Sequence, residues 1–172
     1  AFNPETFAAG LRKEKLLSTQ YLKEQVAAAN RYLDLEISQN IPIRQLIKLR
    51  SDLMDDLLSA LWVKFGCNKS KNALIACGGF GRKELFPYSD LDIVVLTEHA
   101  NKQQLREIES FLTKLWDLGL NLGHSVRSIE ESEKSAREDI TILTNLMEAR
   151  LICGNESSMK ILRGLLSGRN MW

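Results

Sequence analysis

Two aspartates stand two residues apart at the start of an apolar run, within the stretch GGFGRKELFPYSDLDIVVL at residues 78–96. Alternate residues of a β-strand point to the same side, so a strand beginning here would direct the carboxylates of Asp90 and Asp92 together. Two unpaired carboxylates at close range repel each other, and a divalent cation relieves that repulsion. Mg²⁺ is commonly held by one or two carboxylates together with substrate phosphates. The spacing therefore predicts a Mg²⁺ site at Asp90 and Asp92 that serves phosphoryl transfer.

Three glycines precede the aspartates and would supply the other half of such a site. Gly78, Gly79 and Gly81 let the backbone approach a ligand closely and direct N–H groups at phosphate oxygens. Arg82 would add positive charge, and Ser89 a hydroxyl group. The stretch contains neither GxxxxGK[ST] nor the third glycine of GxGxxG, which argues against a P-loop and against a dinucleotide fingerprint.

Each half of this pattern has a simpler explanation when it is taken alone. An SDxD sequence is commonly a turn with a capping aspartate, and GGxG is commonly only a turn. Here a strand, a glycine turn, a short linker, the paired aspartates and a second strand follow one another. This combination favours a site for metal and phosphate over two unrelated turns.

The rest of the chain predicts the elements that would position these residues. A capping residue followed by proline and an acid at residues 3–5 starts a helix, and a broad apolar face recurs at helical spacing over residues 42–65. The expected elements are helices within 3–66, strands at 73–77 and 92–98, a helix at 101–118, a strand at 120–129, helical pattern from 128 through ITILTNLMEARLI, and a last helix after Gly154-Asn155. This order predicts an α+β fold with a small mixed sheet flanked by helices.

Composition excludes several classes of protein. The 172 residues are 44% hydrophobic and 26% charged, which is typical of a globular domain with its own core. A formal net charge of +1 gives no overall field toward DNA, RNA or a membrane surface, and no apolar run approaches the length of a membrane span. Three cysteines at positions 67, 77 and 153, without a CxxC pair, indicate reduced thiols and a cytoplasmic location.

The motif G-G-x-G-R-x-E-L-x-P-x-S-D-x-D, from Gly78 to Asp92, resembles the signature of the polymerase-β-like nucleotidyltransferase superfamily. Together with the stretches at 115–131 and 139–154, it is more closely similar to the N-terminal part of the bacterial PII uridylyltransferase/uridylyl-removing enzyme family. The resemblance covers residues 73–154. It implies a polymerase-β-like fold and the transfer of UMP from UTP, with Mg²⁺, to a tyrosine of the nitrogen-regulatory protein PII.

One element departs from the superfamily pattern. Many members carry a third carboxylate on the strand after the intervening helix, where this sequence has Ser125 or a neighbouring residue. Asp139 is the better candidate for the missing general base, with Glu148 as the other, although Asp139 would equally serve as a helix cap. Arg127 would face the triphosphate, or else form a salt bridge at a strand end, and His124 is expected to be a packed residue.

The expected organisation is a helical N-terminal segment at 1–66, a nucleotidyltransferase domain at 67–154 and the start of a further helical region at 155–172. The chain is interpreted as a fragment of a longer protein, weakly active or inactive by itself. Two alternatives stay open. One is a nucleotidyltransferase of the same fold with another acceptor, and the other is a non-catalytic nucleotide-binding or docking domain, which the missing third acid favours.

Overall fold

A four-stranded mixed sheet forms the centre of the molecule. The computed structural model describes residues 2–13, 17–39 and 41–167. The strands are β1 (Ala73–Ala76), β2 (Leu91–Thr97), β3 (Leu122–Ser128) and β4 (Arg150–Gly154), in the order β3-β2-β1-β4. β1 is antiparallel to both β2 and β4, whereas β2 and β3 are parallel and joined by a helical crossover. The expected α+β fold with a small mixed sheet is confirmed.

Helices account for most of the remaining chain. They are α1 (Pro4–Leu11), α2 (Thr19–Ser38), α3 (Ile43–Lys64), α4 (Gly78–Gly81), α5 (Lys102–Asp117), α6 (Ile129–Glu138), α7 (Ile140–Met147) and α8 (Glu156–Leu165), with a short 3₁₀ turn, η2 (Cys67–Lys69). Their ends carry the expected signals. Asn3 accepts a hydrogen bond from the Thr6 N–H at 3.0 Å, and Gly119, with φ of 76°, terminates α5. No helix within the described part of the chain is long and apolar enough to cross a membrane.

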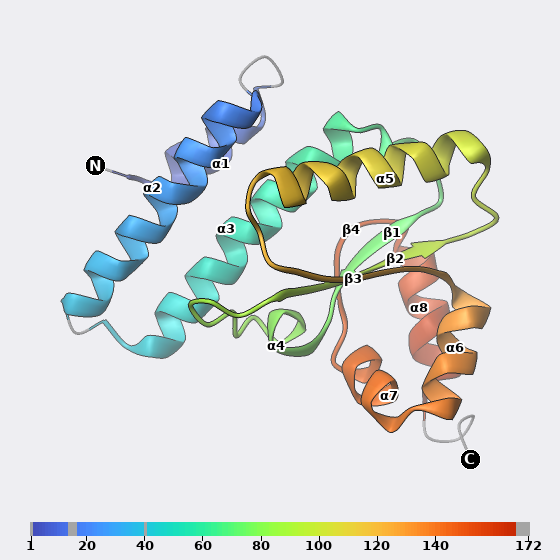
Figure 1. Cartoon of the computed structure of the whole chain (residues 1–172). Coiled ribbons are helices and arrows are strands. Elements are labelled where there is room, and N and C mark those ends of the chain that lie inside the picture. Colours follow the sequence, from blue (N-terminus) through green and yellow to red (C-terminus); the bar gives the residue numbers. More distant parts are fainter. Residues whose placement is uncertain (1, 14–16, 40, 168–172) are drawn as a thin grey trace.

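The sheet separates two layers of helices. α3 and α5 lie on one side of the sheet, and α6, α7 and α8 lie on the other (Figure 1). Alternating strand residues divide the core accordingly: Ile93 and Val95 join the cluster that includes α3 and α5, and Ile75 joins the cluster of α7 and α8. Between α3 and α5, the rings of Trp62 and Phe111 meet edge to face with centroids 5.4 Å apart.

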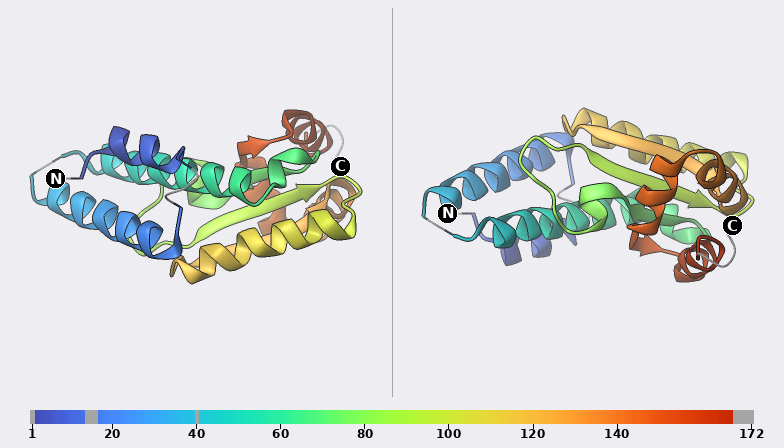
Figure 2. Two further views of the ribbon diagram at one scale, coloured as in Figure 1. Left: turned by 90° about the horizontal axis from the view of Figure 1, so that it is seen from above. Right: turned by 90° about the horizontal axis from the view of Figure 1, so that it is seen from below.

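The N-terminal helices project beyond one end of the sheet (Figure 2). α3 nevertheless continues over the sheet, and buried side chains of α1, α2 and α3 belong to the same hydrophobic cluster as β1, β2 and α5. The helical segment therefore shares a core with the sheet that carries the two aspartates.

The expectation of continuous helix through ITILTNLMEARLI is wrong at its end. α7 stops at Met147, and Arg150–Gly154 forms β4, which pairs antiparallel with β1. All four residues of β1 are buried, so both of its backbone edges need hydrogen-bonding partners inside the protein. β4 supplies the partner on the side opposite β2. Tertiary pairing has thus overridden a helical pattern that is short at this point.

Candidate active site

Asp90 and Asp92 lie at the beginning of β2. Asp90 is exposed just before the strand, and Asp92 is partly buried within it. Burial, and next the negative charge of Asp90, raise the pKa of the Asp92 carboxyl group. Neither carboxylate forms an ion pair with any residue that the structure describes. The described residues therefore leave the repulsion between the two carboxylates without compensation by an ion pair.

The Asp92 side chain is enclosed by two glycines from neighbouring elements. A Cβ added to Gly123, its partner in the parallel register with β3, would lie 2.2 Å from Asp92 Oδ1. A Cβ added to Gly78 would lie 3.1 Å from Asp92 Oδ2, and Gly78 has a φ of 53°. Any larger residue at Gly123 would displace the carboxylate. Our sequence analysis missed Gly123, although an isolated glycine within a strand is a signal of close approach.

The glycine turn expected after β1 is a single helical turn, α4. The turn is closed by hydrogen bonds from the Gly81 N–H to the Cys77 carbonyl oxygen at 2.8 Å and from the Glu84 N–H to the Gly79 carbonyl oxygen at 2.8 Å. A Cβ on Gly81 would lie 2.6 Å from the carbonyl oxygen of Glu148, so this glycine is required for packing against the end of α7. The phosphate-binding role of Gly78, Gly79 and Gly81 stays a prediction.

A cavity of about 240 Å³ opens beside Asp92, on the side of the sheet that faces α6 and α7. Ser125 and Arg127 line it because they share a strand face with Gly123. Arg127 has no ion-pair partner among the described residues, so its guanidinium group is available to an anion in the cavity. Cys77 also lines the cavity, but burial, followed by the charge of Asp92, raises the pKa of its thiol to about 12, which excludes it as a thiolate nucleophile.

Asn145, on α7, is a second residue that sequence reasoning missed. It lines the same cavity, and its Oδ1 lies 3.8 Å from the point where a Cβ of Gly78 would be. The same point lies 3.1 Å from Asp92 Oδ2. Amide oxygens are ligands for hard cations, so the carboxylate and the amide can approach one ion or one substrate group. A single polar amide in the apolar run ITILTNLM was the signal that could have identified it.

Two predicted residues have other partners in the structure. Asp139 caps α7, because its Oδ1 accepts a hydrogen bond of 2.7 Å from the Thr141 N–H, and it does not line the cavity beside Asp92. Arg82 forms ion pairs with Glu84, at 2.9 Å, and with Glu148. Their roles as base and as phosphate ligand stay predictions without geometric support.

Ser89 does not line the cavity beside Asp92. It lines a second cavity, of about 360 Å³. Arg50 and Tyr88 also line this second cavity, and Tyr88 has a φ of 65°. The His124 ring meets that of Trp116 edge to face, with centroids 5.0 Å apart, but His124 is exposed and also lines the cavity beside Asp92. Its interpretation as a packed residue stays a prediction.

The donor set fits a cation that is shared with a substrate. Within the described ranges, no three side chains of histidine, cysteine, aspartate or glutamate come together as a metal-binding group. Asp90, Asp92 and the amide of Asn145 offer oxygen donors only. Mg²⁺ prefers such donors and usually completes its octahedron with waters and phosphate oxygens. These residues could therefore hold Mg²⁺ together with a nucleotide, and they do not form a closed cage of protein ligands.

Comparison with known proteins agrees with this geometry. The family described as "Nucleotidyltransferase domain" matches residues 61–146, which include both aspartates, α4 and Asn145. The chain is 40% identical over 173 residues to the bifunctional uridylyltransferase/uridylyl-removing enzyme of Azotobacter vinelandii, with 99% of the chain aligned. It is 42% identical over 152 residues to the enzyme of the same name from Pseudomonas putida, covering 87% of the chain, and 38% identical over 162 residues to that of Vibrio cholerae, covering 93%. It spans only 17 to 19% of the length of these three relatives.

Proposed function

Because this chain belongs to the nucleotidyltransferase domain family, we propose that it transfers UMP from UTP to a tyrosine of a PII-type signalling protein, with Mg²⁺ bound at Asp90 and Asp92. The observation that carries the proposal is the uncompensated pair of carboxylates, one of which is enclosed by Gly78 and Gly123 beside a cavity. The choice of UMP rests on the relatives, which are named uridylyltransferases. The choice of PII rests on the sequence resemblance.

The proposed reaction is a displacement at the α-phosphorus of UTP. The tyrosine oxygen forms the new bond to phosphorus, the bond to the bridging oxygen breaks, and pyrophosphate leaves. Mg²⁺ in this place would neutralise phosphate charge and polarise the reacting phosphoryl group. Arg127 would bind a phosphate oxygen from its side of the cavity, while Gly78 and Gly79 would let the backbone approach the nucleotide.

The phenolic proton of the acceptor must leave during this reaction, because a tyrosine hydroxyl has an ordinary pKa of about 10. Asp139 is the general base that sequence reasoning favours, and Asp90 is an exposed carboxylate, two residues from Asp92, that forms no ion pair with a described residue. Both assignments are open to direct test by substitution with asparagine.

Two other functions use the same residues. A nucleotidyltransferase with a different acceptor would need an identical metal and triphosphate site. A non-catalytic nucleotide-binding domain is favoured by one specific observation, the presence of Ser125 on the strand where many superfamily members carry a third carboxylate.

The deciding experiment incubates the full-length protein with UTP labelled at the α-phosphate, Mg²⁺ and purified PII. We expect label on PII that is lost when Mg²⁺ is chelated and when Asp92 is replaced by asparagine. Label on another protein in place of PII would support the first alternative. Binding of UTP with no labelled protein at all would support the second.

A further inference from the structure

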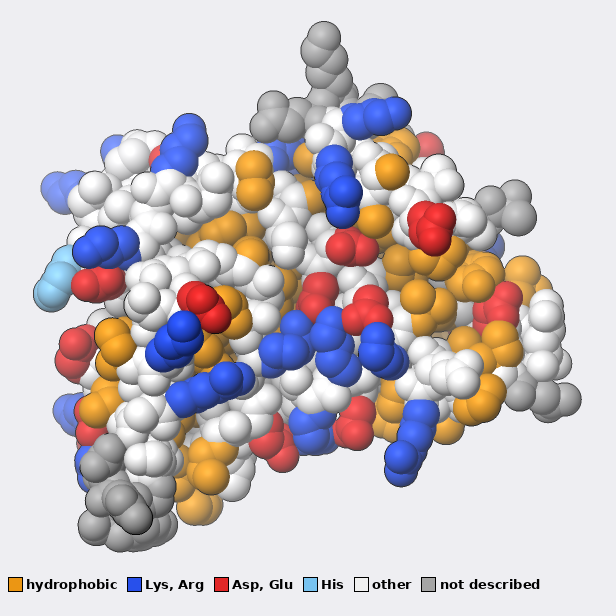
Figure 3. All heavy atoms as spheres, turned by 180° about the vertical axis from the view of Figure 1, so that it is seen from behind, with side chains coloured by type: hydrophobic (Ala, Val, Ile, Leu, Met, Phe, Trp, Pro, Cys, Tyr) orange, Lys and Arg blue, Asp and Glu red, His pale blue; other side chains and the backbone are white. Residues whose placement is uncertain are grey.

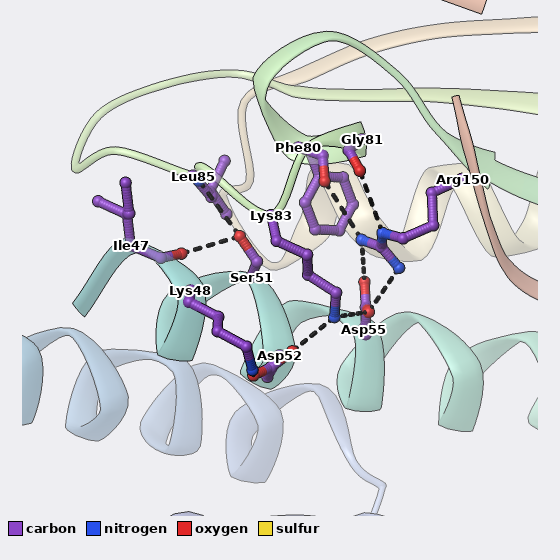
Figure 4. Close-up of polar contacts among 10 residues, drawn as sticks. All are labelled: Ile47, Lys48, Ser51, Asp52, Asp55, Phe80, Gly81, Lys83, Leu85 and Arg150. Carbon is purple, nitrogen blue, oxygen red and sulfur yellow. Dashed lines mark hydrogen bonds and ion pairs between the residues drawn. The ribbon is translucent and has the colours of Figure 1, made fainter. Parts of the chain in front are cut away.

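A cluster of charged side chains connects α3 to the glycine turn α4. Asp55 of α3 accepts two hydrogen bonds from the guanidinium group of Arg150, at 2.8 Å from Nη1 and 3.0 Å from Nη2, and a third from Lys83 Nζ (Figure 4). The Asp55 side chain is only 18% exposed. A two-point contact between arginine and a carboxylate fixes the plane of the guanidinium group as well as its position.

Arg150 carries this constraint to α4. Its Nε donates to the carbonyl oxygen of Gly81 at 3.3 Å, and its Nη2 donates to that of Phe80 at 3.2 Å. The guanidinium carbon also lies 5.5 Å from the centroid of the Phe80 ring. The last two carbonyl groups of the glycine turn are therefore held by an arginine whose orientation Asp55 sets.

The linker that follows the glycine turn is attached to the same helix. Lys83, which has a φ of 63°, also pairs with Asp52, and the Leu85 N–H donates to Ser51 Oγ at 3.2 Å. Ser51 in turn donates to the Ile47 carbonyl oxygen at 2.8 Å. The bond from the Leu85 backbone to Ser51 fixes the linker between α4 and β2 along one side of α3, and Lys83 keeps its pair with Asp55 whether or not Asp52 is charged.

The charges in this cluster compensate one another. On the face opposite to that of Figure 1, basic and acidic side chains lie next to each other at the centre (Figure 3). A partly buried ion pair gains little net stability, because desolvation offsets most of its attraction. Its clearer effect is geometric, and here the geometry concerns α4, whose first residue, Gly78, would bring an added Cβ to 3.1 Å from Asp92 Oδ2.

We propose that Asp55 is a positioning residue for nucleotidyl transfer: through Arg150 it holds the glycine turn at the distance from Asp92 that a bound triphosphate requires. This inference rests on the proposed function. Both residues lie outside the matched segment 61–146, one on each side of it, so the family match gives no indication of their role. The helical segment would then be part of the catalytic unit.

The test compares Asp55→Asn with Asp52→Asn in the full-length protein. Asp52 is a matched control on the same helix, because it pairs with Lys48 and Lys83 but does not contact Arg150. Each variant is measured for melting temperature, for Mg²⁺-dependent UTP affinity by calorimetry, and for kcat and KM of transfer. We expect Asp55→Asn to lower kcat/KM for UTP by roughly 10- to 100-fold, as displacements of about 1 Å do, and Asp52→Asn to stay near wild type.

A second variant keeps the proposal testable if Asp55→Asn fails to fold. Arg150→Lys retains a positive charge facing Asp55 but cannot hold both carbonyl groups, so we expect the same loss in kcat/KM for UTP with a smaller change in melting temperature. Asp55→Glu, which retains the charge, should recover part of that kcat/KM.

The outcomes separate this proposal from the proposed function. If folded Asp55→Asn and Arg150→Lys bind UTP and transfer UMP like Asp52→Asn, the cluster only stabilises the fold and the proposal is overturned alone. If wild-type protein neither binds UTP nor transfers UMP, the proposed function fails first and the positioning role fails with it.

Discussion

Two groups of carboxylates lie near the linker between α4 and β2, and they differ in whether a cation of the protein is paired with them. In the first group, Asp52 pairs with Lys83, and Asp55 pairs with Lys83 and Arg150. In the second group, Asp90 and Asp92 face each other without an ion pair to a described residue, and the pKa of Asp92 is raised by burial and by Asp90. The first group is neutralised by cations of the described residues, whereas the second would be neutralised by the cation that we propose to bind there.

This difference distinguishes carboxylates that hold elements of the fold together from carboxylates that we propose bind a ligand. Like charges that are brought together and left unpaired destabilise the folded state, so their presence has to be explained by what they bind. Compensated charges need no ligand, and they define distances between elements. The following substitutions test the contrast, in order of decreasing expected effect on activity.

Replacing Asp92 by asparagine should have the largest effect. The change removes a charge that we propose to ligate the metal, and a loss of several kcal/mol in transition-state stabilisation corresponds to about 10³-fold or more in rate. In the absence of Mg²⁺, the melting temperature at neutral pH should be maintained or rise, because the ionised form of a carboxyl group with a raised pKa destabilises the fold above that pKa. This gain should disappear as the pH falls and the wild-type carboxyl group becomes protonated.

The control for this prediction is Asp117→Asn, at an exposed acid at the end of α5. It should leave both the transfer rate and the melting temperature unchanged. A wild-type rate for Asp92→Asn would contradict the assignment of the metal site.

Replacing Gly123 by alanine should come next. The added Cβ would lie 2.2 Å from Asp92 Oδ1, and the flexible end of a side chain can rotate away more easily than a backbone can shift. We therefore expect Mg²⁺-dependent UTP affinity to fall by about 10²-fold while the fold is retained. Gly164→Ala in α8, where an added Cβ meets no atom within 4 Å, should keep full affinity and gain up to about 1 kcal/mol of stability. Equal affinities in the two variants would show that the position of the Asp92 carboxylate is unimportant.

Replacing Asn145 by alanine tests whether its side-chain amide acts together with Asp90 and Asp92 in binding Mg²⁺ and UTP. Loss of a supporting ligand group typically lowers metal affinity by about 10- to 100-fold, and we expect the lower part of that range in a calorimetric Mg²⁺–UTP titration. Thr144→Ala, at an exposed neighbour on the same helix, is the matched control. If Asn145→Ala binds like Thr144→Ala, the amide is a bystander.

The smallest effect is expected for Asp139→Asn. Asparagine caps a helix about as well as aspartate, so the melting temperature should hardly change. The structure gives the carboxylate a capping role, and we expect the transfer rate to remain close to wild type. Slowing by about 10²-fold at unchanged UTP affinity would instead identify Asp139 as the general base.

The sequence was sufficient for the features that depend on local pattern. Apolar periodicity located β1, β2 and β3 and the longer helices around them. These features need no knowledge of distant segments. The family resemblance added the expected fold, which the matched domain confirms.

The missed features all depend on contacts between distant parts of the chain. β4 is a strand because β1 needs a second partner, and Asn145 matters because α7 packs beside Gly78. Asp55 acquires its role only when Arg150, 95 residues further along the chain, is brought to it. No window of neighbouring residues contains that information.

The position of β4 at the edge of the sheet has a consequence for where this chain can be shortened. A polypeptide that stopped at residue 146 would contain both aspartates, α4 and Asn145, yet β1 would have a free backbone edge lined with apolar side chains. Such an edge promotes association with other chains. During synthesis the same edge stays open until β4 leaves the ribosome, and the glycine turn has no Arg150 to hold it until then. The sheet is therefore completed from the C-terminal side, at the edge away from the aspartates, by a strand that does not line the cavity beside Asp92.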